Sequence, residues 1–250
     1  MTTAIGHYAR LLAEHYTWMP GGDIAAVAEG QARLLSELGV RPGAAGTLAV
    51  GLGCGPGPQS LALASLGFSP VLAVDTGEPL LAELAAHTGH SSVIRPLHAD
   101  IRTALGEHAE PSSLAAVVCM GDTPTHLPST ADVTALPADA ARCLAPGGQL
   151  VLSHRDLTPP RTGTDRFLPV RATDDRIMTC ALEYVDDETV MVHDLIHTRT
   201  GATWGLRISA HPKLRIGAAW LAKCSAGLGL DVRHSAEGPR GLHVIVAVKP

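Results

Sequence analysis

A glycine-rich loop followed by a carboxylate is the strongest chemical signal in the sequence. Residues 53–57 read Gly-Cys-Gly-Pro-Gly directly after the apolar segment 47–52, and Asp75 ends the next apolar segment, 71–75. Glycines let a ligand approach the backbone closely, and the N-terminus of the following helix attracts an anionic group. A carboxylate at the end of the next strand can accept hydrogen bonds from ribose hydroxyls. The pattern therefore predicts a site for a nucleotide cofactor.

The spacing of the glycines distinguishes two kinds of nucleotide loop. The dinucleotide fingerprint G-x-G-x-x-G requires a third glycine, but that position is Pro56 when counted from Gly51 and Pro58 when counted from Gly53. The spacing G-x-G-x-G is satisfied at 53, 55 and 57. This loop resembles motif I of class I S-adenosylmethionine-dependent methyltransferases. A dinucleotide-dependent oxidoreductase is the second enzyme class compatible with a strand, loop and helix in this order.

The elements that must position the loop alternate along the middle of the chain. Apolar segments that we expect to be strands lie at 47–52, 71–75, 92–97, 115–120 and 149–153, with helices near 59–66, 79–87 and 131–144. Continuous apolar strands that alternate with helices imply a parallel sheet covered on both faces. With the resemblance, this predicts an α/β, Rossmann-like class I methyltransferase fold with a seven-stranded, mostly parallel sheet.

The regions on either side of this core have different patterns. The N-terminal residues read as two helices, and three later segments alternate polar and apolar residues about short turns, which indicates antiparallel strands. We expect one methyltransferase domain made of a helical cap (1–40), a cofactor-binding core (41–156), an antiparallel substrate insert after strand 5 (about 160–211, with strands at 176–185, 189–197 and 202–209), and a C-terminal helix with two strands (212–250).

The methyltransferase resemblance continues through His98–Ile101, Cys119–Thr123 and the L-x-P-G-G turn at 144–148. It implies S-adenosylmethionine as cofactor and S-adenosylhomocysteine as product. It also implies a set of cofactor-binding residues, namely Gly53, Cys54, Gly55, Gly57, Asp75, Thr76, Asp100, Ile101, Met120 and Tyr16. In this family Asp100 would contact the adenine amino group, the alternative being a helix N-cap. Gly51 departs from the family, which often has an acidic residue there to hold the cofactor amino group.

The segment after the fifth strand is a candidate acceptor site. LVLSHRDL, at 150–157, resembles the corresponding segment of glycine and related amine N-methyltransferases, in which a histidine-arginine pair follows the strand. The resemblance implies that Arg155 grips an anionic group of the acceptor and that His154 belongs to the catalytic centre. The alternative is a structural contact between Arg155 and Asp156. Nitrogen is favoured as the methylated atom only by this resemblance.

Other residues could complete the acceptor site. If the acceptor is a hydroxyl, His126 is the best candidate for the base. Residues that we expect to line the acceptor pocket, or alternatively to be core or surface residues, are Asp122, Trp18, His193, His197, Trp204 and Arg207. No helical histidine pair has a third ligand at metal-binding spacing, so we expect no metal.

Composition excludes several classes of partner. The net charge is −5 and aromatic residues make up 3% of 250 residues, so we expect no nucleic acid partner. The uncharged stretch 42–74 is interrupted by glycines and prolines, so we expect no membrane span. Five scattered cysteines and an amphipathic N-terminus without the pattern of a signal peptide predict a cytoplasmic protein. A homo-oligomer is compatible with the sequence.

Together these features predict a methyltransferase that acts on a small molecule. We expect in-line transfer of a methyl group from S-adenosylmethionine to an amine nitrogen. Two alternatives stay open at this point: an O-methyltransferase of a hydroxylated metabolite that uses a histidine base, and a protein that binds the cofactor without catalysis.

Overall fold

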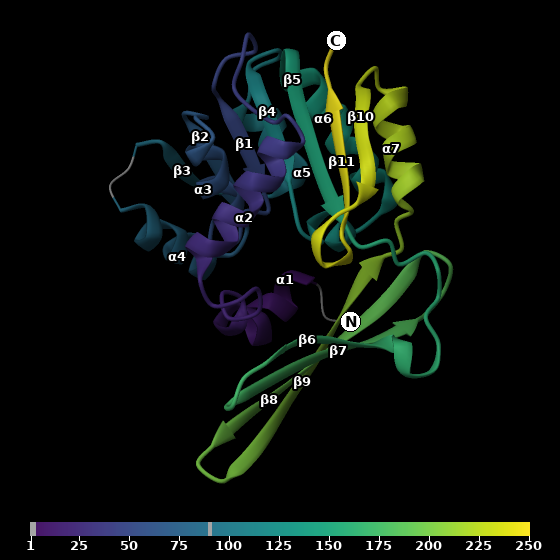
Figure 1. Ribbon diagram of the computed structural model, residues 1–250. Helices are drawn as coiled ribbons and strands as arrows, with labels where there is room; N and C mark the ends of the chain where they lie inside the picture. Colours follow the sequence, from purple (N-terminus) through teal and green to yellow (C-terminus); the bar gives the residue numbers. More distant parts are fainter. Residues whose placement is uncertain (1–3, 90–91) are drawn as a thin grey trace.

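The computed structural model describes residues 4–89 and 92–250 and contains a seven-stranded and a four-stranded sheet (Figure 1). The larger sheet has the order β10-β11-β5-β4-β1-β2-β3, in which β11 alone runs antiparallel to its two neighbours. Its strands are β1 (Ala49–Leu52), β2 (Val71–Asp75), β3 (Ile94–His98), β4 (Leu114–Cys119), β5 (Leu144–His154), β10 (Asp231–Glu237) and β11 (His243–Val248). The expected Rossmann-like methyltransferase fold is confirmed.

Helices cover both faces of this sheet, which explains why its central strands are apolar throughout. Every residue of β1 and β4 is buried. One core layer lies under α2 (Ile24–Glu37), α3 (Pro58–Ser65) and α4 (Glu78–Thr88). The other lies under α5 (Ile101–His108), α6 (Thr130–Cys143) and α7 (Ala218–Gly227). Asp23 and Ser129 cap α2 and α6 by accepting hydrogen bonds from backbone N–H groups of the first turn.

The smaller sheet is antiparallel and lies beyond the carboxyl ends of the parallel strands (Figure 1). It consists of β6 (Phe167–Ala172), β7 (Arg176–Tyr184), β8 (Thr189–Thr200) and β9 (Thr203–Leu214). The expected insert is therefore present, but it differs from the expectation in one additional strand and in the end of its last strand. β6 was not predicted, and β9 runs to Leu214 where the sequence indicated a helix from residue 212. Both segments contain a proline, which edge strands tolerate because they have fewer ladder hydrogen bonds to lose.

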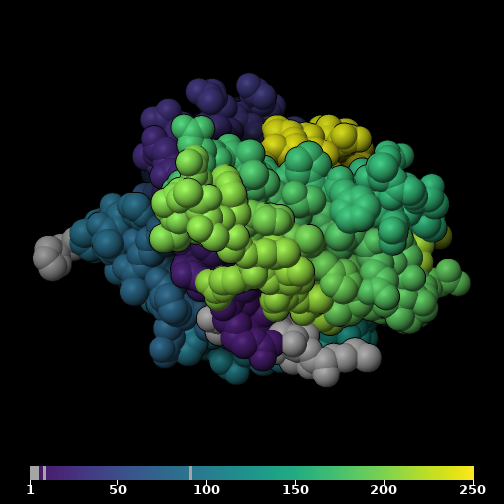
Figure 2. Space-filling view, turned by 90° about the horizontal axis from the view of Figure 1, so that it is seen from below, coloured from purple at the N-terminus to yellow at the C-terminus, as the bar shows by residue number. Residues whose placement is uncertain are grey.

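The N-terminal cap lies between the two sheets (Figure 1). It begins with the short turns α1 (Ala4–His7), η1 (Tyr8–Leu12) and η2 (Ala13–His15) and continues into α2. Leu11 and Leu12 pack against Met178 and Ile196 of the smaller sheet. Figure 2 shows this segment between the smaller sheet and α4. Within the described residues, no helix combines the length and the apolar character needed to cross a membrane.

Candidate functional site

The glycine loop is closely enclosed by the protein's own side chains. Gly53, Gly55 and Gly57 have φ of 63°, 54° and 104°, which disfavours any residue with a Cβ. A Cβ on Gly53 would lie 2.4 Å from Cγ2 of Thr123, and a Cβ on Gly57 would lie 2.2 Å from Cδ1 of Leu84. The loop therefore requires glycine at both positions for conformation and for space.

Asp75 lies beside this loop at the end of β2, as predicted. Its Oδ2 accepts a hydrogen bond of 2.8 Å from Gly55 N, and its Oδ1 accepts one of 2.8 Å from Gly77 N. Burial raises the pKa of Asp75, and these backbone donors oppose the shift. The carboxylate is thus fixed by the loop itself, and its contact with a ribose stays a prediction.

Gln59 is a structural residue of the site that the sequence did not indicate. Its Nε2 donates to the carbonyl of Leu52 at 3.0 Å, and its Oε1 accepts from Met120 N at 3.1 Å. The amide therefore joins the carboxyl ends of β1 and β4. A Cβ on Gly51 would lie 3.3 Å from Gln59 Nε2, so the space beside the position that is often acidic in the family is already occupied. In the sequence, Gln59 could have been noticed as a polar residue in the first turn of an otherwise apolar helix.

Tyr16 covers the glycine loop from the side of the N-terminal cap. Its Cε1 lies 3.1 Å from the position of a Cβ on Gly55. Burial, and then the nearby charge of Asp75, raise the pKa of Tyr16 to about 12, so the hydroxyl keeps its proton at neutral pH. The next residue, Thr17, donates a hydrogen bond to Glu83 of α4. The cap is therefore attached to both sides of the cofactor loop.

Three other predicted cofactor residues lie at the ends of β2 and β3. Asp100 is the N-cap of α5, with Oδ1 accepting from Arg102 N at 2.9 Å, and its side-chain bond with Arg102 lowers its pKa. This matches the N-cap alternative, and the adenine contact stays untested. Ile101 is the first residue of α5 and packs partly against the core. The carbonyl of Thr76 lies 3.1 Å from Nε2 of His98.

Cys54, in the glycine loop, is buried, and burial raises the pKa of its thiol.

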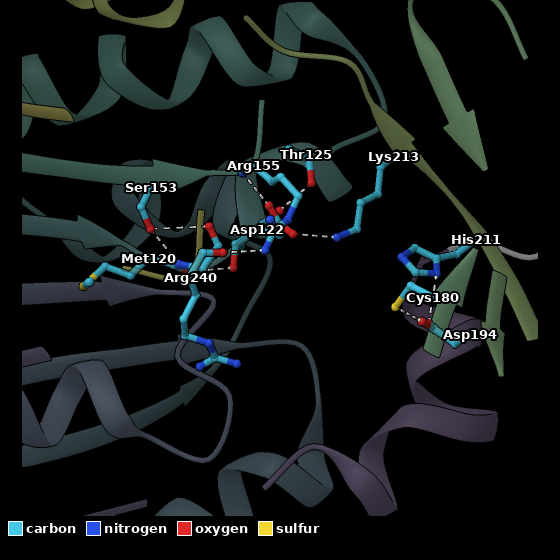
Figure 3. Close-up of polar contacts among 12 residues, drawn as sticks. Met120, Asp122, Thr125, Ser153, Arg155, Cys180, Asp194, His211, Lys213 and Arg240 are labelled. Carbon is cyan, nitrogen blue, oxygen red and sulfur yellow. Dashed lines mark hydrogen bonds and ion pairs between the residues drawn. The ribbon is translucent and has the colours of Figure 1, made fainter. Parts of the chain in front are cut away.

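Asp122 connects the larger sheet to the smaller one (Figure 3). Its Oδ1 accepts a hydrogen bond of 2.7 Å from Arg155 N, and its Oδ2 lies 2.9 Å from Nζ of Lys213 on β9. Burial raises the pKa of Asp122, but the charge and hydrogen bond of Lys213 and the bond from Arg155 N hold it well below its ordinary value. The sequence did not indicate Lys213, because the chain was expected to be helical from residue 212, whereas β9 runs to Leu214.

The histidine and arginine after β5 have partners that differ from those expected. Nη2 of Arg155 donates to the carbonyl of Arg240 at 2.8 Å, and Asp156 instead accepts bonds from Thr158 N and Ala218 N. His154 is fully buried, and its Nε2 lies 3.1 Å from the carbonyl of Ile216. Arg155 thus contacts Arg240 rather than Asp156, and the acceptor contact of Arg155 and the catalytic role of His154 stay predictions.

Three imidazoles form a stack next to Asp122 and Lys213. The rings of His126 and His211 are 5.1 Å apart and nearly parallel, and the rings of His211 and His7 are 4.3 Å apart. Burial, and then the charge of Lys213, lower the pKa of His126 to about 3. His126 is thus neutral at physiological pH, and its role as a base stays untested.

The residues expected to line the acceptor site on the smaller sheet lie on two different faces of that sheet. In β8 the buried residues are Val190, Val192, Asp194 and Ile196, so His193 and His197 lie on the opposite face. Arg207 pairs with Ile196 on the buried side and contacts Glu14, whereas Trp204 is 42% exposed. The predicted alternation of β8 is confirmed, and the contact of these residues with an acceptor stays a prediction.

Trp18 attaches the cap to the smaller sheet. The guanidinium groups of Arg171 and Arg176 lie 5.1 and 5.0 Å from the centre of its ring. Its carbonyl also accepts a hydrogen bond from Arg171. These contacts correspond to the structural alternative for Trp18.

Comparisons with known proteins agree with this geometry. Residues 49–148 match a family model described as a methyltransferase domain. No curated protein matches the chain in sequence. Among solved structures, a S-adenosylmethionine-dependent methyltransferase from Clostridium acetobutylicum ATCC 824 is 13% identical, with 97% of this chain and 98% of that chain covered and a TM-score of 0.72.

Two further solved structures are similar over most of their length. The amino pentose methyltransferase CalS10 from Micromonospora echinaspora is 17% identical over 96% of this chain and 97% of its own, with a TM-score of 0.73. The sugar N-methyltransferase KedS8 from Streptoalloteichus sp ATCC 53650 is 17% identical over 94% of this chain and 92% of its own, with a TM-score of 0.70. The chain therefore has the class I methyltransferase fold, and its residues 49–148 match the model of a methyltransferase domain.

Proposed function

We propose that this methyltransferase transfers a methyl group from S-adenosylmethionine to an amine nitrogen of a small molecule. The observation that carries the proposal is the position of Asp122, which lies at the same edge of the sheet as the glycine loop and Asp75, beneath the cap and the smaller sheet. Two proteins that share the fold are CalS10, an amino pentose methyltransferase, and KedS8, a sugar N-methyltransferase. They favour nitrogen, and an amino sugar is the first acceptor to test.

The residues around the loop fit this cofactor. Asp75 presents a carboxylate to ribose hydroxyls, and the glycines leave the backbone accessible to the amino acid part. Tyr16 would cover the bound molecule from the cap. S-adenosylmethionine supplies an electrophilic methyl group on a sulfonium, so the chain has to hold the acceptor in line and exclude water.

The acceptor side follows from Asp122. Its carboxylate is kept ionised by Lys213 and can accept a hydrogen bond from an acceptor N–H. The nitrogen lone pair would form the new N–C bond while the C–S bond breaks and its electron pair goes to sulfur, which releases S-adenosylhomocysteine. The methylated ammonium would then give its extra proton to water. A neutral amine brings its own lone pair, so a strong base is not required. This agrees with a site whose ionised carboxylate serves to orient the acceptor.

Two experiments test the proposal. Calorimetric titration with S-adenosylmethionine and S-adenosylhomocysteine should show one saturable site, and NAD should not bind. Amino sugars and matched sugars with a hydroxyl in place of the amine are then compared by release of S-adenosylhomocysteine and by the position of the added methyl group in mass spectra. Methylation of the hydroxyl compounds alone would favour the O-methyltransferase with His126 as base. Cofactor binding without turnover of any acceptor would favour a non-catalytic protein.

A further inference from the structure

We propose that His7, Asp194 and His211 form a binding site for one divalent transition-metal ion of the zinc type. The three residues are 0%, 2% and 2% exposed. His7 Nε2 lies 2.7 Å and His211 Nδ1 lies 3.7 Å from Asp194 Oδ2, and one potential ligand atom of each residue lies within 4.8 Å of the others. Imidazole nitrogen and carboxylate oxygen are ordinary ligands of zinc. This inference does not depend on the proposed reaction.

The distance between His211 and Asp194 suits two ligands of one ion. At 3.7 Å the pair is too far apart for a hydrogen bond. Two ligand atoms that each lie about 2.1 Å from a tetrahedral ion are about 3.4 Å apart. The 2.7 Å contact of His7 with Asp194 has to widen by about 0.7 Å for the same geometry. The side chains thus need only small movements to bind an ion.

Outer partners for the ligands are already in place. His7 Nδ1 lies 2.8 Å from Oγ of Ser209, which can accept the ring proton when Nε2 binds an ion. Cys180 Sγ donates a 2.8 Å hydrogen bond to Oδ1 of Asp194 (Figure 3). His7 contacts the other carboxylate oxygen, Oδ2. Metal-bound histidines and carboxylates commonly have such second hydrogen bonds, which fix their orientation.

The charge of Asp194 also favours a cation. In the part of the chain that the structure describes, Asp194 forms ion pairs with histidines and with no lysine or arginine. A buried carboxylate is stabilised by a full positive charge at short range. A divalent ion between the three ligands would supply that charge.

An ion bound by these residues would link the cap to the smaller sheet. His7 belongs to α1, Asp194 to β8 and His211 to β9. His7 and Asp194 are 187 residues apart in sequence, so no spacing motif could indicate the cluster. A bound ion would fix the start of the segment that carries Tyr16.

Cobalt titration of the full-length chain, freed of metal with a chelator, tests the site. We expect one Co²⁺ per chain, with the visible absorption of a low-coordinate site and displacement by Zn²⁺. Zn²⁺ should also raise the unfolding temperature. His7→Gln retains a polar side chain of similar reach and should keep the fold, but should weaken Co²⁺ binding more than about 100-fold, since loss of an outer partner alone costs about 10- to 100-fold.

His193→Ala provides the matched control. His193 is on the same strand as Asp194 but on the other face, where it contacts Glu183 at 2.7 Å. This variant should bind Co²⁺ like the wild type. The proposal is overturned if the wild type binds no stoichiometric ion, or if a folded His7→Gln or His211→Gln variant, checked by circular dichroism, binds Co²⁺ with unchanged affinity and spectrum.

Discussion

The ion pair between Lys213 and Asp122 offers the most quantitative test of the site. The two side chains are 2.9 Å apart and 12% and 21% exposed. Removing one partner of a buried pair costs about 3–5 kcal/mol. Because both side chains retain some contact with water, we expect Lys213→Met to lower the free energy of unfolding by about 2–3 kcal/mol. For a chain of this size that corresponds to a fall of about 4–12 °C in Tm.

A double-mutant cycle separates the pair from general damage. Asp122→Asn leaves Lys213 without its carboxylate and should also destabilise the protein. The double variant should lose less than the sum of the single losses, with a coupling of about 1–3 kcal/mol. Arg233→Met is the control, since the Arg233–Asp231 pair is 65% and 49% exposed and should contribute little. Additive losses in thermal or denaturant unfolding would refute the coupling.

The difference in unfolding free energy between wild type and Lys213→Met should depend on pH, and the direction follows from Asp122. The pKa of Asp122 is lowered in the folded state, so its ionisation stabilises the fold above the unfolded pKa of about 3.9. This contribution is lost as the pH falls through the folded pKa. In Lys213→Met the lone buried carboxyl should protonate more readily. The stability gap between wild type and variant should therefore shrink as the pH falls from about 5 toward 3. A gap that stays constant over that range contradicts the reasoning.

Three further substitutions test the cofactor side of the site. Asp75→Ala should weaken S-adenosylmethionine binding by about 1.5–3 kcal/mol, or about 10- to 150-fold by calorimetry, and unchanged affinity would refute the ribose contact. Gln59→Leu should lower stability by about 1–3 kcal/mol in denaturant unfolding, because two buried backbone groups lose their partner. Gly53→Ala should lower the free energy of unfolding by about 1–3 kcal/mol more than Gly163→Ala. The two glycines have similar φ values, 63° and 55°, but only a Cβ on Gly53 would meet a close neighbour, Cγ2 of Thr123 at 2.4 Å. Equal costs would show that Thr123 moves aside freely.

The core of the fold could be predicted because its signals are local. Strands buried on both faces must be apolar along their whole length, and the glycine loop and Asp75 fall at strand ends whatever the tertiary contacts are. The predictions were wrong where the position of a segment in the folded protein outweighs its local sequence preference. The strand β6 was not predicted, and a helix was expected from residue 212, but Pro169 and Pro212 both lie in edge strands of the smaller sheet, where a missing N–H is tolerated.

The site was predictable only in part, for a related reason. Residues that end parallel strands, such as Asp122, meet at one edge by topology alone. Their partners depend on how the smaller sheet docks, and Lys213 arrives from β9, 91 residues later in the chain. The two-residue period of β8 separated its faces correctly but contained no information on which face meets the core.

The cap is the element through which the two halves of the site depend on each other. Tyr16 packs on Gly55 of the cofactor loop, and Thr17 is bonded to α4. A few residues earlier, Glu14 pairs with Arg207 and His7 with Asp194, both on the smaller sheet. A movement of this segment that exposes the loop must therefore break contacts to the smaller sheet as well. The contacts that hold the cap on the glycine loop and those that hold it on the smaller sheet are thus made by one short segment of the chain, residues 7–17.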